Sequence, residues 1–237
     1  MKSRRQAPCA SRKLGCCLDI TQRSQKKEMN IHYYNGSDLK RLPPEATQAK
    51  IRTALVQEVA KQGIGATSVG AVAKRAGMSA GTIYLHFENK EDMLRKVFLQ
   101  IKTEIHTLMM SSAGDPDAKS MIRKMWFDLF GFVAAHPMDF MFVEYAGAAQ
   151  ILSKKQARKV ADMQLEIAAL IQRGIDEGAV VDMPVPTVTT LLIAPAMQLA
   201  RLGVLANEQP SEEALGLVFE RVWLSVSAKP SFGNLPD

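Results

Sequence analysis

The segment from Ser68 to Lys90, SVGAVAKRAGMSAGTIYLHFENK, constrains the fold of this chain more than any other stretch. Its first half carries small apolar residues at the i, i+3, i+4 and i+7 spacing of one helix face: Val69, Val72, Ala73 and Ala76. Ser68, or Thr67 before it, can cap the start of this helix. The pattern predicts a short helix that buries one narrow side.

A turn and a second helix follow. Gly77 supplies the left-handed backbone that a sharp turn needs after a helix, and Met78 is expected to pack between the two helices. Ser79 caps the second helix, whose buried side we expect to carry three residues: Ile83, Tyr84 and Phe87. Two short helices around a glycine-containing turn form a helix-turn-helix, and its second helix lies in the DNA major groove.

The residues of the second helix suit contact with DNA. Small residues at its start let the backbone approach the duplex: Ala80, Gly81 and Thr82. Donors for phosphate oxygens come later: Tyr84, His86 and Lys90. Pro43 and Pro44 start a preceding brace helix. We therefore predict a DNA-reading head over residues 41–90, with a core of Ile51, Leu55, Val59, Val72, Ile83 and Phe87.

The string AGMSAGTIYLHFENKEDML closely resembles the signature of the tetracycline-repressor (TetR) family, with strong similarity over about residues 51–99. The resemblance implies an all-α homodimer with an N-terminal DNA-binding domain and a larger C-terminal helical domain that holds a small-molecule inducer. Carried over residue by residue, the family's DNA contacts fall on Thr67, Ser68, Ser79, Ala80, Gly81, Thr82, Tyr84, His86 and Lys90. Ala80 departs from the long polar residue often found there, and it offers at most a contact to a thymine methyl.

Each of these residues has a simpler interpretation. A Tyr or His near a helix end is more often a surface or packing residue than a ligand. The prediction of DNA contacts therefore depends on the whole string and not on any single member.

The rest of the chain reads as further helices. Asn89, with Asp92 three residues later, resembles a capping box that opens a long helix ending before SSAGDP. Five more helices are expected over residues 118–135, 137–151, 154–177, 185–207 and 211–227. Pro195 should kink or interrupt the fourth of these. The predicted fold is all-α, with about nine helices and a regulatory, ligand-binding and dimerisation domain over residues 91–237.

The net charge of +6 is unevenly distributed. Residues 1–27 hold eight Lys or Arg and one Asp. Residues 40–90 hold eight basic and three acidic residues, whereas residues 91–237 hold fourteen basic and eighteen acidic ones. A basic head on an acidic domain directs that head toward the phosphate backbone.

Residues 1–40 are predicted to be a basic, disordered extension. All three cysteines lie in it, at Cys9, Cys16 and Cys17, in a spacing that matches no zinc site. A redox switch there is the less favoured alternative to incidental thiols. Met29 stands where a helical repressor could begin, so residues 1–28 are a candidate for a segment that does not belong to the native product. Lys40 and Arg41 could serve as a minor-groove arm.

The last two helices carry more apolar surface than a terminal hairpin can bury in its own domain. Pairing with a second copy would cover the excess, and the resemblance implies dimerisation through the same helix pair. Two heads would then address half-sites about 34 to 36 Å apart, or somewhat more, on a near-palindromic operator.

Aromatic and Met side chains in the second domain suggest an apolar ligand pocket: Trp126, Phe130, Phe142, Tyr145, Met163 and Met197. Ordinary core packing is the simpler interpretation of each. Glu144 would favour a cationic or hydrogen-bonding ligand if it faced inward, although a solvated position is the expected one. His106 and His136 lack partners at ligand spacing, so we predict no metal, and we expect no cofactor.

The sequence favours a ligand-responsive transcriptional repressor over two other functions. A DNA-bound scaffold that recruits a protein partner and senses no small molecule is the second. An enzyme is the third, but the chain has no nucleophile elbow, phosphate loop or dinucleotide fingerprint. No run approaches eighteen apolar residues and no secretory signal is evident, so we expect a cytoplasmic protein without a membrane helix.

Overall fold

The computed structural model describes residues 43–228, and the predicted all-α class is confirmed over that range. The helices are α1 (Pro44–Ala66), α2 (Val69–Ala76), α3 (Ala80–Tyr84), α4 (Lys90–Met110), α5 (Ala118–Ala135), α6 (Pro137–Ala148), α7 (Lys154–Asp176), α8 (Val185–Ala206) and α9 (Glu212–Val226). Among these residues, β pairing is limited to one antiparallel bridge between Val180 and Ser227. The predicted extension over residues 1–40, with its cysteines, lies outside the described range.

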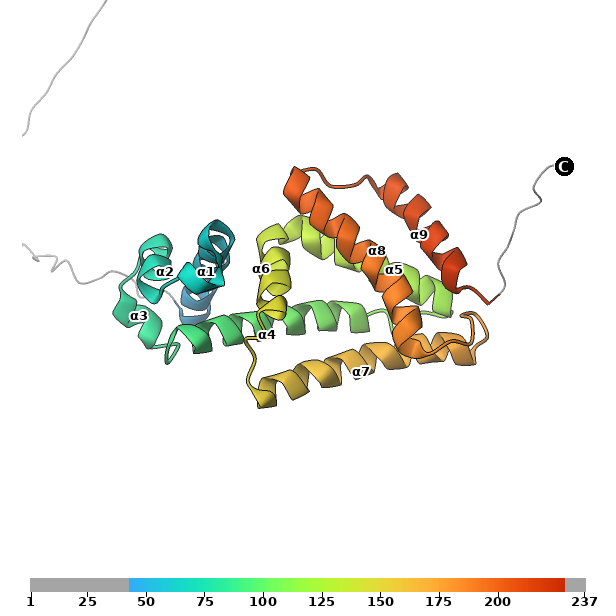
Figure 1. Cartoon of the computed structure of the whole chain (residues 1–237), viewed down its shortest axis with the longest axis horizontal. Helices are drawn as coiled ribbons and strands as arrows, with labels where there is room; N and C mark the ends of the chain where they lie inside the picture. The colour runs from blue at the N-terminus through green and yellow to red at the C-terminus, as the bar shows by residue number, and fades with distance from the viewer. Residues whose placement is uncertain (1–42, 229–237) are drawn as a thin grey trace, which may run out of the picture. The chain divides into compact units, whose positions relative to one another are not determined.

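Helices α1, α2 and α3 form the head, and Figure 1 shows them grouped at the start of α4. Its predicted core is confirmed, since all six side chains are buried: Ile51, Leu55, Val59, Val72, Ile83 and Phe87. Pro44 occupies the first turn of α1 as predicted. The helical backbone of α1 is interrupted at Gly63, where φ is 78°, and the chain then makes a last turn to Ala66.

Helix α4 leaves the head and runs beside α5, α6 and α7. Asn89 caps it, because its side-chain oxygen accepts a hydrogen bond from the Asp92 amide at 2.8 Å. The second hydrogen bond of the predicted capping box, from the Asn89 amide to the Asp92 side chain, is replaced by a neighbouring one. The Asp92 carboxylate accepts from the Glu88 amide at 3.0 Å, one residue before the cap.

The remaining helices begin at their predicted residues to within one position, because proline or a capping side chain marks each start. Helix α6 ends three residues before the predicted limit, ahead of Gln150, whose φ of 49° is incompatible with a continuing helix. Pro195 was predicted to kink or interrupt α8; the helix continues through it, so the interruption is wrong, whereas the kink stays a prediction. Central helix α5 packs against α4, α6, α7, α8 and α9.

The far end of α4 is held by Arg173 of α7. Its guanidinium donates to the carbonyl oxygens of Ala113 and Asp115 at 2.8 Å each, in the loop between α4 and α5. Its Nε also donates to Glu177 at 2.7 Å. This arginine anchors the loop to α7, so both ends of α4 are constrained.

Helix α8, with 22 residues, is long and apolar enough to cross a membrane by length and composition alone. Core helices of globular proteins share these two properties, so the expectation of no membrane helix stays a prediction. Within the helix, 28% of its most apolar 18-residue stretch is buried. Helix α8 packs against α5, α7 and α9 within the helical domain.

Candidate nucleic-acid interface

The turn between α2 and α3 is built by Gly77. Its φ and ψ of 68° and 36° are left-handed, and the Met78 amide donates to the Ala73 carbonyl at 3.0 Å. The Gly77 amide donates to the Lys74 carbonyl at 3.3 Å. These two bonds form a Schellman motif, which ends α2 and redirects the chain. Met78 is half-buried against the core, close to its predicted role.

Serines cap both helices, as predicted. Ser68 Oγ accepts from the Ala71 amide at 3.2 Å at the start of α2. Ser79 Oγ accepts from the Thr82 amide at 3.1 Å at the start of α3, and the two hydroxyl oxygens lie 3.0 Å apart. Both hydroxyls of α3 are therefore already engaged within the head, and a DNA phosphate would share them.

Gly81 is not required by the interior of the head. A Cβ built there would meet only Ser79 Oγ, at 3.5 Å, which is ordinary contact. Ala80 and Gly81 are both exposed at the start of α3. Their small size therefore leaves room on the outer side of the helix, where a duplex would approach.

Tyr84 does not lie on the buried side of α3, and that prediction is wrong. Its side chain is 55% exposed, whereas Ile83 is fully buried. One residue advances an α-helix by about 100°, and Tyr84 points away from the side on which Ile83 is buried. The exposed phenol is instead free to reach a phosphate, which was the other role predicted for it.

Thr67 differs from the other predicted DNA contacts because it is 1% exposed. Its hydroxyl donates to the Gly63 carbonyl at 2.8 Å, and its amide donates to the same oxygen at 3.2 Å. The side chain therefore stabilises the junction between α1 and α2. A contact of its hydroxyl with DNA would require this bond to break.

Lys90 and His86 lie where α3 passes into α4. Lys90 Nζ donates to the Gly65 carbonyl at 2.8 Å, which leaves two of its three donors for a phosphate. His86 is half-buried beside the Phe87 ring, and its carbonyl accepts from Lys96 Nζ at 3.4 Å. Lys96 also pairs with Asp92 at 2.8 Å.

Two family models match this chain, one over the head and one over the helical domain. Residues 51–97 match the model described as bacterial regulatory proteins of the tetR family, and residues 95–228 match a tetracyclin repressor-like C-terminal domain. The second match alone covers more than half of the chain. The chain belongs to the TetR family. It is accordingly a transcriptional regulator with a helix-turn-helix DNA-binding domain.

Relatives of this TetR-family chain agree. The HTH-type transcriptional repressor SCO4008 of Streptomyces coelicolor is 30% identical over 160 residues, which are 65% of this chain and 78% of that protein. A TetR family regulator from Marinobacter aquaeolei superposes with a TM-score of 0.71 at 24% identity, covering 78% of this chain and 97% of that one. The FadR regulator of Bacillus subtilis, solved in complex with stearoyl-CoA, has a TM-score of 0.57 at 20% identity over 74% of this chain and 95% of its own.

The six residues predicted to line a ligand pocket are distributed over four helices of the TetR-type helical domain. Trp126 and Phe130 of α5 pack with ring centroids 5.6 Å apart, and Trp126 meets Phe219 of α9 edge-on at 5.8 Å. Phe142 of α6 and Met163 of α7 are buried. Met197 of α8 is half-buried, whereas Tyr145 is 46% exposed. The structure brings Trp126 and Phe130 together, and it adds Phe219, which the sequence prediction missed.

Other polar groups in the domain have partners that the sequence did not indicate. Glu144 of α6 forms an ion pair with Arg201 of α8, so it is neither a solvated carboxylate nor one facing an empty pocket. His106 Nε2 lies 3.0 Å from the Glu166 carboxylate. His136 Nδ1 lies 3.8 Å from the Asp139 carboxylate.

Proposed function

We propose that this protein is a transcriptional repressor that binds a near-palindromic operator as a homodimer and is released by a small, largely apolar molecule. The main support is the head: a helix-turn-helix with capped helices and a buried core that presents small residues and an exposed Tyr84 along α3. The Streptomyces relative is named a transcriptional repressor, and this chain matches 78% of that protein.

Dimerisation is supported by apolar side chains that the helical domain leaves exposed. Four belong to α8 and one to α9: Leu191, Ile193, Leu202, Leu205 and Leu217. Exposed apolar side chains on two adjacent helices are typical of a subunit interface, and we call these five side chains the apolar face. Pairing these helices across a two-fold axis would cover this face and place two heads on one side of a duplex.

Ligand binding is supported by Trp126. Its side chain is buried, and its indole N–H has no hydrogen-bond acceptor among the described residues. An orphaned buried donor is costly, so a ligand oxygen placed there would gain a hydrogen bond. The B. subtilis FadR structure contains stearoyl-CoA, a molecule with a long apolar chain and polar oxygens. We infer a ligand of comparable character for this chain.

A scaffold that recruits a protein partner without an inducer is the second candidate. It is favoured by the dense packing of the predicted pocket residues, since Trp126, Phe130, Phe142 and Met163 are all buried by protein. Thermal unfolding separates the two. A compound that raises the melting temperature progressively with the logarithm of its concentration supports the repressor, whereas a panel including stearoyl-CoA that leaves it unchanged supports the scaffold.

The DNA-binding part is tested by selecting bound fragments from genomic DNA, followed by gel-shift titration at several salt concentrations. We expect one near-palindromic site and an affinity that falls steeply with salt, because phosphate contacts release counterions. The double variant Tyr84→Phe and Lys90→Met should weaken every duplex alike. If the wild type binds all sequences with equal affinity, it has no specific operator. If the double variant binds as tightly as the wild type, Tyr84 and Lys90 of the head do not contact DNA.

The dimer is tested by light scattering on the variant Leu205→Glu with Leu217→Glu, which should shift the protein to a monomer. Leu165→Glu is the matched control. It places the same charge on an exposed leucine of α7, outside the proposed interface, and should leave the dimer intact. A dimer that survives the double variant would move the interface elsewhere.

A further inference from the structure

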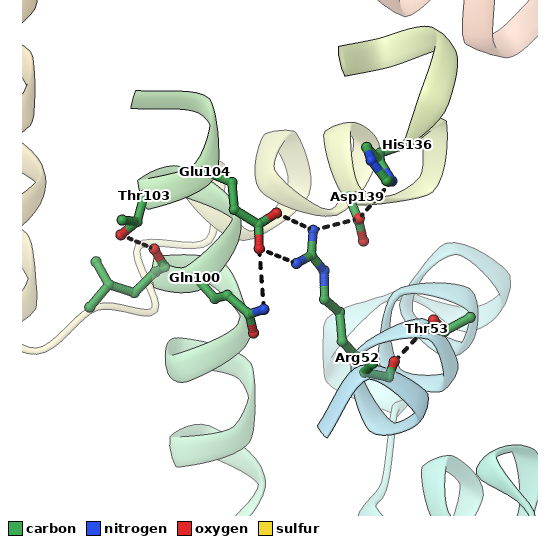
Figure 2. Close-up of polar contacts among 9 residues, drawn as sticks. Arg52, Thr53, Gln100, Thr103, Glu104, His136 and Asp139 are labelled. Carbon is green, nitrogen blue, oxygen red and sulfur yellow. Dashed lines mark hydrogen bonds and ion pairs between the residues drawn. The ribbon is translucent and has the colours of Figure 1, made fainter. Parts of the chain in front are cut away.

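Arg52 of α1 joins the head to two helices of the helical domain (Figure 2). Its Nη1 and Nη2 donate to the two carboxylate oxygens of Glu104 on α4, at 2.5 and 2.7 Å. Its Nη2 also donates to Asp139 Oδ2 on α6, at 2.7 Å. One guanidinium therefore binds carboxylates from two helices at once, and we name these three residues the Arg52 clasp.

Two of the three side chains of the clasp are largely shielded from water. The side chains of Arg52 and Asp139 are 13% and 12% exposed, and Glu104 is 41% exposed. Burial alone would lower the pKa of Arg52, but the hydrogen bonds and charges of Glu104 and Asp139 raise it overall. A buried bidentate arginine is geometrically specific, because its planar fork fits a carboxylate in few orientations.

Each carboxylate of the clasp has a further neighbour. Gln100, one turn before Glu104 on α4, donates to its Oε1 at 3.2 Å and helps to orient it. His136 Nδ1, at the cap of α6, lies 3.8 Å from Asp139 Oδ2, beyond hydrogen-bonding distance, and Figure 2 shows the two side chains next to each other. Because Arg52 binds carboxylates on α4 and α6, the clasp depends on the relative positions of α1, α4 and α6.

The position of Glu104 on α4 gives the head a second point of attachment to this helix. The head is joined covalently to α4 at Lys90, and Glu104 lies about 21 Å further along that helix axis. The head is thus attached to α4 at one end and again through Arg52. If α4 or α6 shifts, the head must either move with it or break the clasp.

Helix α6 extends this link to α8. Asp139, in its first turn, accepts from Arg52, and Glu144, about one and a half turns later, pairs with Arg201 of α8. The two ion pairs connect α1 to α6 and α6 to α8. Helix α8 carries most of the exposed apolar face that we assign to the subunit interface.

We propose that the Arg52 clasp couples the position of the head to α6, and through α6 to the subunit interface, so that it decides which operator spacing the dimer accepts. This rests on the proposed function as a dimeric operator-binding protein. Arg52 is a positioning residue and does not touch DNA. Discrete ion pairs of this kind have two arrangements, formed and broken, which is what a switch requires.

The test measures the position of the head directly, by a spin-label distance within one chain. Labels at Lys74→Cys on α2 and Lys159→Cys on α7 use exposed sites, with Cys9, Cys16 and Cys17 changed to Ser. The clasp predicts one narrow distance distribution for this reference protein. Arg52→Met should at least double its width and lower operator affinity about tenfold. Lys50→Met, on the exposed side of α1, is the matched control and should change neither quantity.

Two further variants keep the test decisive if Arg52→Met folds poorly. Asp139→Asn removes one carboxylate charge and should broaden the distribution by a smaller amount. The exchange Arg52→Glu with Glu104→Arg, combined with Asp139→Asn, restores opposite charges between α1 and α4 without a second carboxylate beside position 52, and should recover the narrow distribution and most of the affinity. A merely structural arginine would not be rescued in this way.

The outcomes separate this proposal from the proposed function. An unchanged distribution in folded Arg52→Met and Asp139→Asn overturns the clasp, even if the operator is bound normally. A broadened distribution supports the clasp, even if the wild type binds all duplexes alike, in which case the operator-binding function fails instead.

Discussion

Arg75 Nε of α2 donates to Glu58 Oε1 of α1 at 2.6 Å, and this ion pair ties the brace helix to the first helix of the reading motif. Glu58 is buried, and its other oxygen accepts from Gln62 at 2.8 Å. The pair fixes the angle between α1 and α2. It also explains a buried carboxylate within an otherwise apolar core.

Glu58→Ala should lower the free energy of unfolding by about 1 to 2 kcal/mol, because Arg75 would lose its partner while remaining able to reach water. Urea denaturation followed by circular dichroism measures this change. Glu88→Ala, at an exposed position between α3 and α4, should stay within about 0.5 kcal/mol of wild type. Equal stability of the two variants would show that the ion pair contributes nothing.

Thr67→Val and Tyr84→Phe each remove one hydroxyl from the predicted interface and should have opposite consequences. Thr67→Val should destabilise the fold by about 1 kcal/mol, since its buried hydroxyl bonds to the Gly63 carbonyl. Tyr84→Phe should leave stability unchanged and weaken all duplexes alike, by about fivefold, if the exposed phenol binds a phosphate. Thermal melts and gel-shift titrations of both proteins decide between these roles.

Gly77→Ala should destabilise the head by about 1 kcal/mol through backbone strain alone. Its φ is +68°, and nothing lies within 4 Å of a Cβ built there, so no steric clash contributes. Gly70→Ala is the matched control on the preceding helix, where a Cβ is also unopposed and φ is ordinary. It should stabilise by up to about 1 kcal/mol. A loss of similar size in both variants would contradict the assignment of strain to the turn.

Gly174→Ala should destabilise the helical domain by about 1 to 3 kcal/mol, because its Cβ would lie 2.9 Å from Val180 Cγ2 and 3.2 Å from Ala118 Cβ. Adding Val180→Ala should recover part of the loss by removing the nearest methyl group. Gly131→Ala on α5 meets nothing within 4 Å and serves as the control. Calorimetry of the single and double variants measures the coupling, and strict additivity would rule out the clash.

Glu104 should make the stability of the protein depend on pH. Burial would raise the pKa of Glu104, but the hydrogen bonds and charge of Arg52, with Gln100 and His136, hold it below the ordinary value. A carboxylate with a lowered folded pKa contributes stability that is complete above its unfolded pKa, about 4.3, and is lost as pH falls through the folded value.

The destabilisation caused by Glu104→Gln should therefore be largest near pH 7 and should shrink between about pH 5 and pH 3. Urea titrations at half-unit pH intervals on wild type and variant measure this difference. Glu208→Gln, in the exposed loop after α8, should show no such trend. If the stability difference between wild type and variant stays constant with pH, the contribution of Glu104 to stability does not come from its negative charge.

Local features of the sequence predicted the secondary structure well. Helix starts follow from proline or from a capping serine, asparagine or aspartate, and the apolar spacing of α1 to α3 identified a core that is buried as expected. These signals act over a few residues. The errors are local too: Tyr84 was assigned to the buried side of α3 although its side chain is exposed, and α6 was extended past the positive φ of Gln150.

The sequence by itself determined the helix-turn-helix, because caps, the Gly77 turn and apolar periodicity depend only on neighbours along the chain. Only the tertiary structure decided which charges meet. Arg52 is separated from Glu104 by 52 residues and from Asp139 by 87. Nothing in the local pattern distinguishes these residues from solvated surface charges. Their pairing exists because apolar packing of α1, α4 and α6 brings the three helices together, and the buried guanidinium then requires both carboxylates.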